Sequence, residues 1–334
     1  MKTKVNLLLT FFWVAISVTG QPKEGLKHVE GKIKANGILI AYEIYAPEND
    51  QTILLIAGTG SQLTDWPTAI CTKLALKGYR VIRFDNRDVG LSSKFDLLGA
   101  PDWVKIFPKI KTCDTIGLPY TIHSMARDAV GLLDALKIKR AHVVGASMGG
   151  AIAQIMAINF PERILSLSCI GASSGDPNLP PGDPKVLAIM ATLPPTDASD
   201  RERAKYLVNI YKAMENNSQL TPDSVLVAMA TRNVKRCWNP EGVARQAAAI
   251  LIADNCDRRN SLKNINIPSV VIHGDRDPVV NISAAKQISA AIKGSRLIIL
   301  PGMGHALSST FHDRLVEGIL LAVGNNKETR VGEK

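Results

Sequence analysis

The sequence contains few of the residues that hold metal ions, and it has no concentrated basic segment that would suit a nucleic acid. Five cysteines and six histidines are spread over 334 residues, and no two cysteines have the close C-x-x-C spacing of a zinc site. The 40 basic and 30 acidic residues give a net charge of +10, but the basic residues are scattered instead of forming blocks. We therefore expect no metal ion and no nucleic-acid partner.

A phosphate-binding loop and an internal repeat are also missing. The glycine-rich stretch at residues 58–62 reads Gly-Thr-Gly-Ser-Gln and lacks the Gly-Lys-Ser/Thr ending of a nucleotide-binding loop. The residues therefore give no reason to expect an organic cofactor. Hydrophobic residues make up 46% of the chain and charged residues 21%, which is typical of a globular protein with a sizeable core.

The first twenty residues differ from the rest of the chain. Lys2 and Lys4 precede an apolar stretch at residues 5–18, and small residues stand before Gln21. This stretch is shorter than the roughly 20 residues that a membrane-spanning helix needs. The pattern predicts a secretory signal at residues 1–20, cleaved after Gly20, and hence a secreted or periplasmic protein with no stable membrane span. The alternative is an uncleaved N-terminal membrane anchor.

The odd number of cysteines means that at least one stays unpaired within the chain. Cys169 lies in an apolar run that is typical of a central strand, so we expect it to be a buried free thiol. Cys237 and Cys256 are the candidates for a disulfide bond.

Short apolar runs alternate with helical patterns along most of the chain. Asn36-Gly37 between residues 32–34 and 38–45 predicts an antiparallel hairpin. The alternation that follows predicts an α/β fold, with a mostly parallel sheet and helices on both faces. The expected strands are residues 52–57, 80–85, 141–146, 164–172, 269–273 and 296–300, and the expected helices are 66–77, 121–137, 149–159, 283–292 and 308–323.

The alternation stops between residues 173 and 262, where prolines cluster and several amphipathic helical stretches follow. We interpret this region as a helical cap inserted into the core. The core then consists of residues 21–172 and 263–325, and residues 326–334 are expected to be a flexible tail.

A nucleophilic serine is predicted at the end of the run at residues 141–146. Gly145-Ala-Ser147-Met-Gly149 matches G-x-S-x-G and lies between an expected strand and an expected helix. A nucleophile in this motif occupies a strained turn, where side chains two residues before and after it would collide with backbone. Gly145 and Gly149 meet that requirement.

The base and the acid are predicted in loops after the last two strands. His305 follows the strand at 296–300 and lies among small, turn-forming residues, where it is free to reach across the sheet edge. Two carboxylates compete to orient it, Asp275 and Asp277. We favour Asp277 because it lies two residues further into its loop, and we expect Asp275 to brace the loop. The order Ser147, Asp277, His305 is that of the α/β-hydrolase class.

Acyl transfer also requires an oxyanion hole made of two backbone N–H groups. Met148, directly after the nucleophile, is expected to supply one. Thr59, in the loop after the strand at 52–57, is expected to supply the other. Gly58 and Gly60 on either side let this backbone approach a ligand closely.

With these motifs in place, the chain resembles the α/β-hydrolase superfamily over nearly all of its expected mature length, and within it the aclacinomycin methylesterase-like esterases. The resemblance is carried by Gly58 with Trp66 eight residues later, by D-x-R-x-x-G-x-S at residues 85–92, by the elbow at 145–150, and by the turns at 274–279 and 301–305. Ala57 stands where many members have a histidine, which leaves the backbone donor unchanged. The resemblance implies ester hydrolysis through an acyl-enzyme, with the cap selecting the substrate.

Other activities occur on the same fold. An amidase or a proline iminopeptidase-like aminopeptidase would bind the substrate amine with acids in the cap, for which Glu215, Asp223 and Glu241 are the candidates. Perhydrolase or acyltransferase chemistry and a non-catalytic binder are further alternatives. Residues 185–194 and 224–237 contain methionine and aliphatic residues but no acid, so we expect a neutral, largely apolar ester as the substrate.

Overall fold

The computed structural model describes residues 26–216 and 218–324. The signal segment predicted at residues 1–20 and the tail predicted at 326–334 lie outside the described residues. Within the described ranges, no helix is long and apolar enough to cross a membrane.

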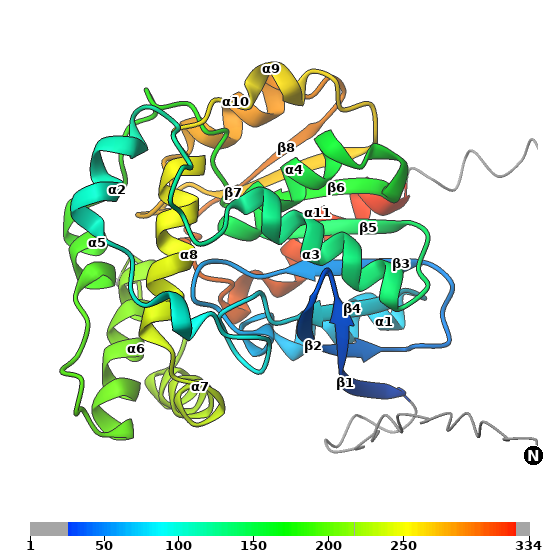
Figure 1. The fold of residues 1–334 in the computed structure, drawn as a ribbon. Helices are drawn as coiled ribbons and strands as arrows, with labels where there is room; N and C mark the ends of the chain where they lie inside the picture. Colours follow the sequence, from blue (N-terminus) through cyan, green and yellow to red (C-terminus); the bar gives the residue numbers. More distant parts are fainter. Residues whose placement is uncertain (1–25, 217, 325–334) are drawn as a thin grey trace, which may run out of the picture.

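The described residues form one eight-stranded sheet at the centre of the molecule (Figure 1). The strand order is β1-β2-β4-β3-β5-β6-β7-β8. The pairs from β4 across to β8 are parallel, whereas β1–β2 and β2–β4 are antiparallel. This topology confirms the predicted fold class. The strands are β1 (His28–Ala35), β2 (Ile38–Tyr45), β3 (Thr52–Ile56), β4 (Arg80–Phe84), β5 (Ala141–Ala146), β6 (Ile164–Ile170), β7 (Ser269–Gly274) and β8 (Arg296–Leu300).

The predicted hairpin connects β1 and β2. Asn36 and Gly37 have φ angles of 47° and 81°, which is the left-handed backbone that a two-residue hairpin turn of this twist requires. Ala35 pairs with Ile38 across the turn. β1 begins at His28, four residues earlier than predicted.

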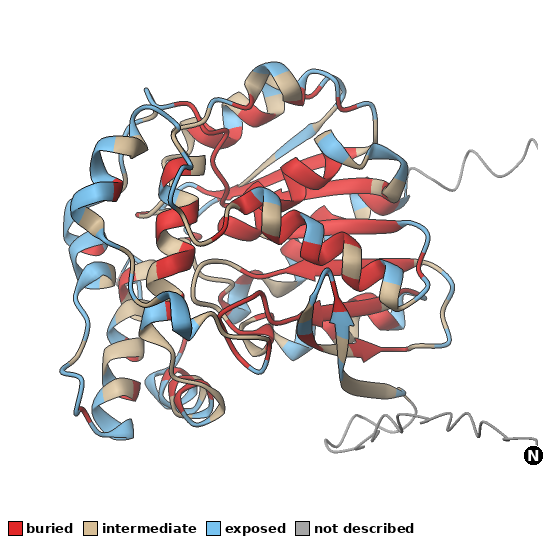
Figure 2. Cartoon of the chain, viewed as in Figure 1, coloured by how far each residue is buried: buried red, intermediate tan, exposed pale blue. Residues whose placement is uncertain are grey.

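Helices cover both faces of the sheet, because side chains alternate along each buried strand. Leu54 and Ile56 of β3 belong to the hydrophobic cluster that includes residues of α3, α4 and α10. Ile53 and Leu55 point the other way, into the cluster with α1 and α11. Figure 2 shows that the central strands are buried almost throughout. The helices are α1 (Thr68–Leu76), α2 (Trp103–Ile110), α3 (Ile122–Ala135), α4 (Met148–Asn159), α5 (Pro184–Ala191), α6 (Asp200–Met214), α7 (Asp223–Arg236), α8 (Pro240–Ala253), α9 (Arg259–Leu262), α10 (Ser283–Ala291) and α11 (His312–Gly324).

The helices α5 to α9 lie between β6 and β7 in the chain, and α5 to α8 gather at one side of the sheet (Figure 1). α6 and α7 share a small hydrophobic cluster around Val208, Leu226 and Ala230. α8 instead contacts α2, α3 and α4. The β6–β7 segment, residues 173–262, therefore contains a helix pair with its own core and a helix that packs on the main body.

A disulfide bond joins Cys113, after α2, to Cys256, after α8. The predicted pairing of Cys237 with Cys256 is therefore wrong. Residues 143 positions apart meet because α2, which the sequence pattern did not predict, packs on α8 through Ile106 and Ile252. Cys237 is a free thiol, and Cys169 is free and buried, as expected.

Candidate active site

Ser147 lies in the turn between β5 and α4, and its backbone has φ 55° and ψ −122°. A positive φ costs a non-glycine residue on the order of 1–3 kcal/mol, so the surrounding structure must hold the turn. The Ser147 N–H donates to the carbonyl of Ile170 on β6, with N and O 2.9 Å apart. The turn is thereby anchored to the neighbouring strand.

The two flanking glycines are required by close backbone contacts. A Cβ at Gly145 would lie 2.0 Å from the carbonyl oxygen of Gly149, and one at Gly149 would lie 2.1 Å from that of Ile56. Both distances are far below any van der Waals contact. The sequence-based reason for glycine at these positions therefore matches the geometry.

His305 and Asp277 form a hydrogen-bonded relay with Ser147. His305 Nε2 lies 3.0 Å from Ser147 Oγ, and His305 Nδ1 lies 2.8 Å from Asp277 Oδ2. The backbone N–H of His305 donates to the carbonyl of Met214 at the end of α6, 2.7 Å away. The structure thus brings together three residues that are 130 and 28 positions apart in sequence.

The two competing carboxylates have different positions. Asp277 Oδ1 accepts hydrogen bonds from the N–H groups of Val279 and Val280, at 2.8 and 2.9 Å, which directs Oδ2 towards His305. Asp275 Oδ1 accepts a hydrogen bond from the N–H of Gly302, at 2.7 Å, in the loop that carries His305. Asp275 therefore joins the two loops, and Asp277 contacts the imidazole.

His273, in β7, is a neighbour that the sequence patterns did not identify. Its buried Nε2 lies 3.4 Å from Asp277 Oδ2 and 2.8 Å from the carbonyl oxygen of Val280, to which it donates. Burial lowers the pKa of His273, and this effect outweighs the charge of Asp277, which acts in the opposite direction. His273 is therefore a neutral donor that supports the Asp277 loop.

The relay's electrostatics stabilise a positive charge on His305. Burial would lower the pKa of His305, but the charge and hydrogen bond of Asp277, with the charge of Asp254, raise it above its ordinary value. Burial would raise the pKa of Asp277, but the charge and hydrogen bond of His305 lower it. Asp277 is thus ionised at neutral pH and can stabilise an imidazolium that forms beside it.

Asp254, at the C-terminal end of α8, is a second residue that sequence reasoning missed. Burial raises the pKa of Asp254 to about 6, while the charge of Arg258, a hydrogen bond from Ser173 and the charge of His305 oppose that rise. Asp254 Oδ1 lies 3.8 Å from a nitrogen of Arg258. An acid from the β6–β7 segment therefore lies near the histidine, in a stretch of sequence that showed no catalytic pattern.

The loop expected to supply the oxyanion donor lies beside Ser147. A Cβ on Gly58 would lie 3.2 Å from the Cβ of Ser147. Gly60 has φ +70°, and its N–H donates to the side chain of Gln246 on α8, 2.8 Å away. Thr59 lies between these two glycines, and Met148 begins α4 directly after Ser147. Gly58, next to Thr59 in the chain, and Met148 therefore both lie next to Ser147.

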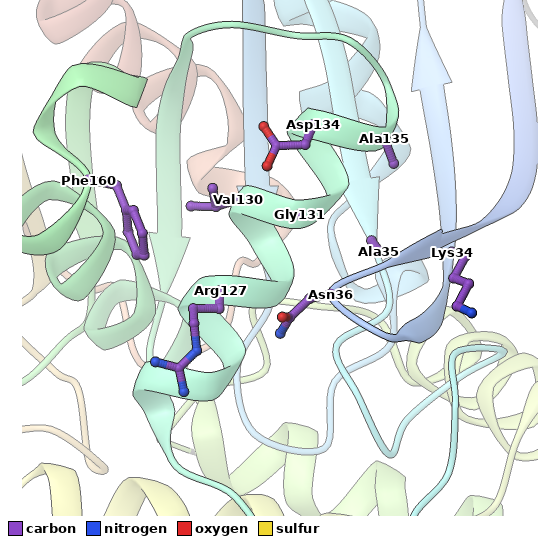
Figure 3. Close-up of a pocket in the computed structure, with 9 residues that line it drawn as sticks. All are labelled: Lys34, Ala35, Asn36, Arg127, Val130, Gly131, Asp134, Ala135 and Phe160. Atoms are coloured by element: carbon purple, nitrogen blue, oxygen red, sulfur yellow. The ribbon is translucent and has the colours of Figure 1, made fainter.

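A surface hollow of about 530 Å³ lies away from this site. Figure 3 shows it between α3 and the turn that carries Asn36, with Arg127, Val130 and Phe160 at its wall. A smaller hollow of about 260 Å³ includes Asp277 in its lining and borders the acid loop. Hydrogen-bond geometry, and not the size of a hollow, therefore identifies the candidate active site.

The sequence model of the alpha/beta hydrolase fold matches residues 51–310. The chain belongs to the α/β-hydrolase fold family. It is 26% identical over 288 residues to rhodomycin D methylesterase of Streptomyces peucetius, covering 81% of this chain and 90% of that protein. It is 27% identical over 266 residues to a 2-hydroxy-6-oxononadienedioate/2-hydroxy-6-oxononatrienedioate hydrolase of Paraburkholderia xenovorans, covering 78% of this chain and 82% of that one.

A solved structure, the meta-cleavage product hydrolase of Pseudomonas fluorescens, has the same fold with a TM-score of 0.68. It is 21% identical in sequence and covers 89% of this chain and 97% of its own. The methylesterase relative agrees with the resemblance noted from the motifs. The names of these proteins describe one methylesterase and two hydrolases of other substrates.

The family's D-x-R-x-x-G-x-S segment has a structural role in this chain. The Asp85 carboxylate accepts hydrogen bonds from the N–H groups of Leu63 and Leu91, both at 2.7 Å. It also pairs with Arg236 of α7, 2.7 Å away. A Cβ on Gly90 would lie 2.1 Å from the Asp85 carboxyl carbon. The segment thus connects the loop after β4 to the β6–β7 segment.

The pKa of His305 should fall when Asp277 is replaced by asparagine. Asp277→Asn removes the negative charge that raises this pKa, while burial still lowers it. The imidazole should therefore stay neutral to lower pH than in the wild type, which NMR titration of His305 would measure. Asp275→Asn is the matched control, because Asp275 contacts Gly302 and not the imidazole. A larger downward shift in the control would assign the acid to Asp275.

Proposed function

We propose that the protein is a serine hydrolase that cleaves carboxylic esters, with Ser147 as nucleophile, His305 as base and Asp277 as the orienting acid. The observation that carries this proposal is the relay itself, with 3.0 Å from Ser147 Oγ to His305 Nε2 and 2.8 Å from His305 Nδ1 to Asp277 Oδ2. Both distances are within the range for proton transfer and for fixing the histidine tautomer.

In the first half-reaction, Ser147 Oγ bonds to the ester carbonyl carbon while its proton moves to His305 Nε2. The tetrahedral intermediate then collapses, the bond to the alcohol oxygen breaks, and the alcohol leaves with that proton. In the second half-reaction, water attacks the acyl-enzyme as its proton moves to His305. The carboxylic acid product leaves, and His305 returns a proton to Ser147 Oγ. Asp277 stays ionised and stabilises the imidazolium in both halves.

We assign the oxyanion donors to the N–H groups of Thr59 and Met148. Two neighbouring donors of the Thr59 loop are engaged elsewhere, because Gly60 donates to Gln246 and Ser61 donates to the carbonyl of Gly58. Met148 is the first residue of α4, where N–H groups have no partner within the helix. Both groups can then meet the negative charge that develops on the carbonyl oxygen.

We also propose that residues 173–262 act as a cap that selects the substrate. The contact of Met214 with the His305 backbone and that of Gln246 with Gly60 support this role. Part of the apolar surface expected to line the pocket is used elsewhere, since Leu226 and Ala230 of α7 pack within the α6–α7 cluster.

Aminopeptidase activity is a second candidate, favoured by Asp254. Of the acids expected to bind an amine, Glu215 accepts hydrogen bonds from Thr221 and Ser308, while Asp223 and Glu241 are exposed. Asp254 has a buried oxygen without a hydrogen-bond partner among the described residues. Arg258 already partly balances the charge of Asp254, so a substrate ammonium would have to compete with Arg258 for this carboxylate. We therefore favour the neutral ester.

Ser147→Ala should reduce ester turnover by on the order of 10³-fold or more, because only the attacking oxygen is lost. Covalent labelling by a fluorophosphonate should disappear, while the thermal unfolding midpoint stays near that of the wild type. Mass spectrometry of the labelled peptide provides the measurement. Labelling of the alanine variant at the wild-type level would show that Ser147 is not the nucleophile.

The enzyme should have a higher kcat/KM for an uncharged aliphatic ester than for a proline arylamide. A bound substrate ammonium has to be paired inside the pocket, since an unpaired buried charge is costly. Steady-state rates on both substrates should be compared with those of Asp254→Asn. If the wild type cleaved the arylamide faster than the ester, and Asp254→Asn lost that arylamide activity, the result would favour the aminopeptidase.

We propose that the full chain is exported and that its mature form begins near Gln21. The disulfide between Cys113 and Cys256 supports this location, because such bonds persist in oxidising compartments. N-terminal sequencing of the exported protein should start close to Gln21. Recovery of an intact Met1 in the membrane fraction would instead support an N-terminal anchor.

A further inference from the structure

The loop that carries Thr59 is held from one side by the β6–β7 segment. Gln246 of α8 accepts a hydrogen bond from the N–H of Gly60, with N and O 2.8 Å apart. Its amide nitrogen donates to the carbonyl of Arg87, 2.6 Å away. Gln246 is fully buried, so water cannot replace these bonds without a rearrangement.

Gly60 has little freedom to move away from this contact. A Cβ on Gly60 would lie 3.0 Å from Val243 of α8, one turn before Gln246. The hydrogen bond fixes the peptide plane between Thr59 and Gly60. On the other side of Thr59, Gly58 packs against Ser147. Thr59 is thus held between the nucleophile turn and α8.

α8 itself is held against neighbouring parts of the chain at two places. In its first half, Arg245 makes two hydrogen bonds of 2.8 Å to Asp88, and both side chains are fully buried. Just beyond its end, Cys256 forms the disulfide with Cys113. These contacts hold Gln246 in a fixed position. A residue that sets catalytic geometry needs such a rigid element to carry it.

We propose that Gln246 is a positioning residue for the oxyanion hole, holding the Thr59 N–H where the negative charge develops. This inference rests on the proposed function of Ser147 and Thr59. A donor that acts only in the transition state is worth about 10²–10³ in kcat, and a displacement of about 1 Å can cost about 10²-fold. Loss of the Gln246 contact should therefore lower kcat and leave ground-state binding nearly unchanged.

The test compares Gln246→Met with the wild type. Methionine keeps the length of the side chain but removes both hydrogen bonds. We expect kcat to fall by about 10- to 100-fold with KM within about twofold, and the rate of fluorophosphonate labelling to fall in parallel. The acid limb of the pH–rate profile should not move, because the Asp277–His305 bond is intact. A fall in kcat of less than about fivefold would overturn the proposal.

Gln154 provides the matched control. It is another fully buried glutamine, on α4, whose amide contacts the carbonyl of Ser173 and the side chain of Arg258 instead of the oxyanion loop. Gln154→Met should lose comparable stability in a denaturant titration but keep kcat within about threefold. An equal loss of kcat in both variants would assign the effect of Gln246 to general destabilisation.

If Gln246→Met does not fold, the comparison of Gln246→Glu with Gln246→Asn takes its place. Glutamate retains an oxygen at the distance that Gly60 needs, whereas asparagine is one methylene too short. We expect a higher kcat for the glutamate variant at equal KM, and equal kcat values would overturn the proposal. Absence of Ser147-dependent labelling in the wild type would instead refute the proposed function itself.

Discussion

A serine with a positive φ between β5 and α4 is the constraint on which the rest of the site depends. The turn exposes the hydroxyl at the carboxyl edge of the sheet, but it is tolerated only if nothing collides with its backbone. Gly145 and Gly149 satisfy that condition, because any side chain there would overlap with main-chain atoms about 2 Å away. The strain is offset by the buried parallel strands on either side, and β6 accepts the Ser147 N–H.

The charges near this turn favour a positive charge on His305 and a negative charge on Asp277. His305 is buried, which lowers its pKa, yet Asp277 and the charge of Asp254 together more than compensate. Asp277 is kept ionised by His305 and by two backbone N–H groups. His273, beneath the same carboxylate, is kept neutral by burial. Two histidines beside one acid thus have opposite pKa shifts, and only one of them reaches the serine.

The parts of the structure that sequence predicted correctly are those encoded locally. Asn36-Gly37 predicted a hairpin because its backbone requirement is confined to two residues, and the strands followed from short apolar runs. The choice of Asp277 over Asp275 agrees with the hydrogen bonds because it depended on reach within a single loop. The same reasoning could not give contacts such as Cys113 with Cys256, since pairing across 143 residues depends on how α2 packs on α8.

Gln246 and Asp254 could not be identified from the sequence for a related reason. Their neighbours in sequence form an ordinary amphipathic helix, and their significance lies in what faces them.

The helices of the β6–β7 segment differ in how firmly buried contacts hold them to the core. α5 is largely exposed (Figure 2), whereas α7 is also held to the core, because its Arg236 pairs with the buried Asp85. α8 carries the buried Arg245–Asp88 pair, the contact with Gly60 and the disulfide at its end. Removing one member of such a buried pair leaves an uncompensated charge, at a cost of about 3–5 kcal/mol, so α8 cannot move away without that penalty. Arg236 of α7 and Arg245 of α8 thus hold the segment to the loop after β4 at two places. If the segment acts as the proposed cap, substitutions that change substrate choice should be best tolerated in α5, where only Val186 is buried.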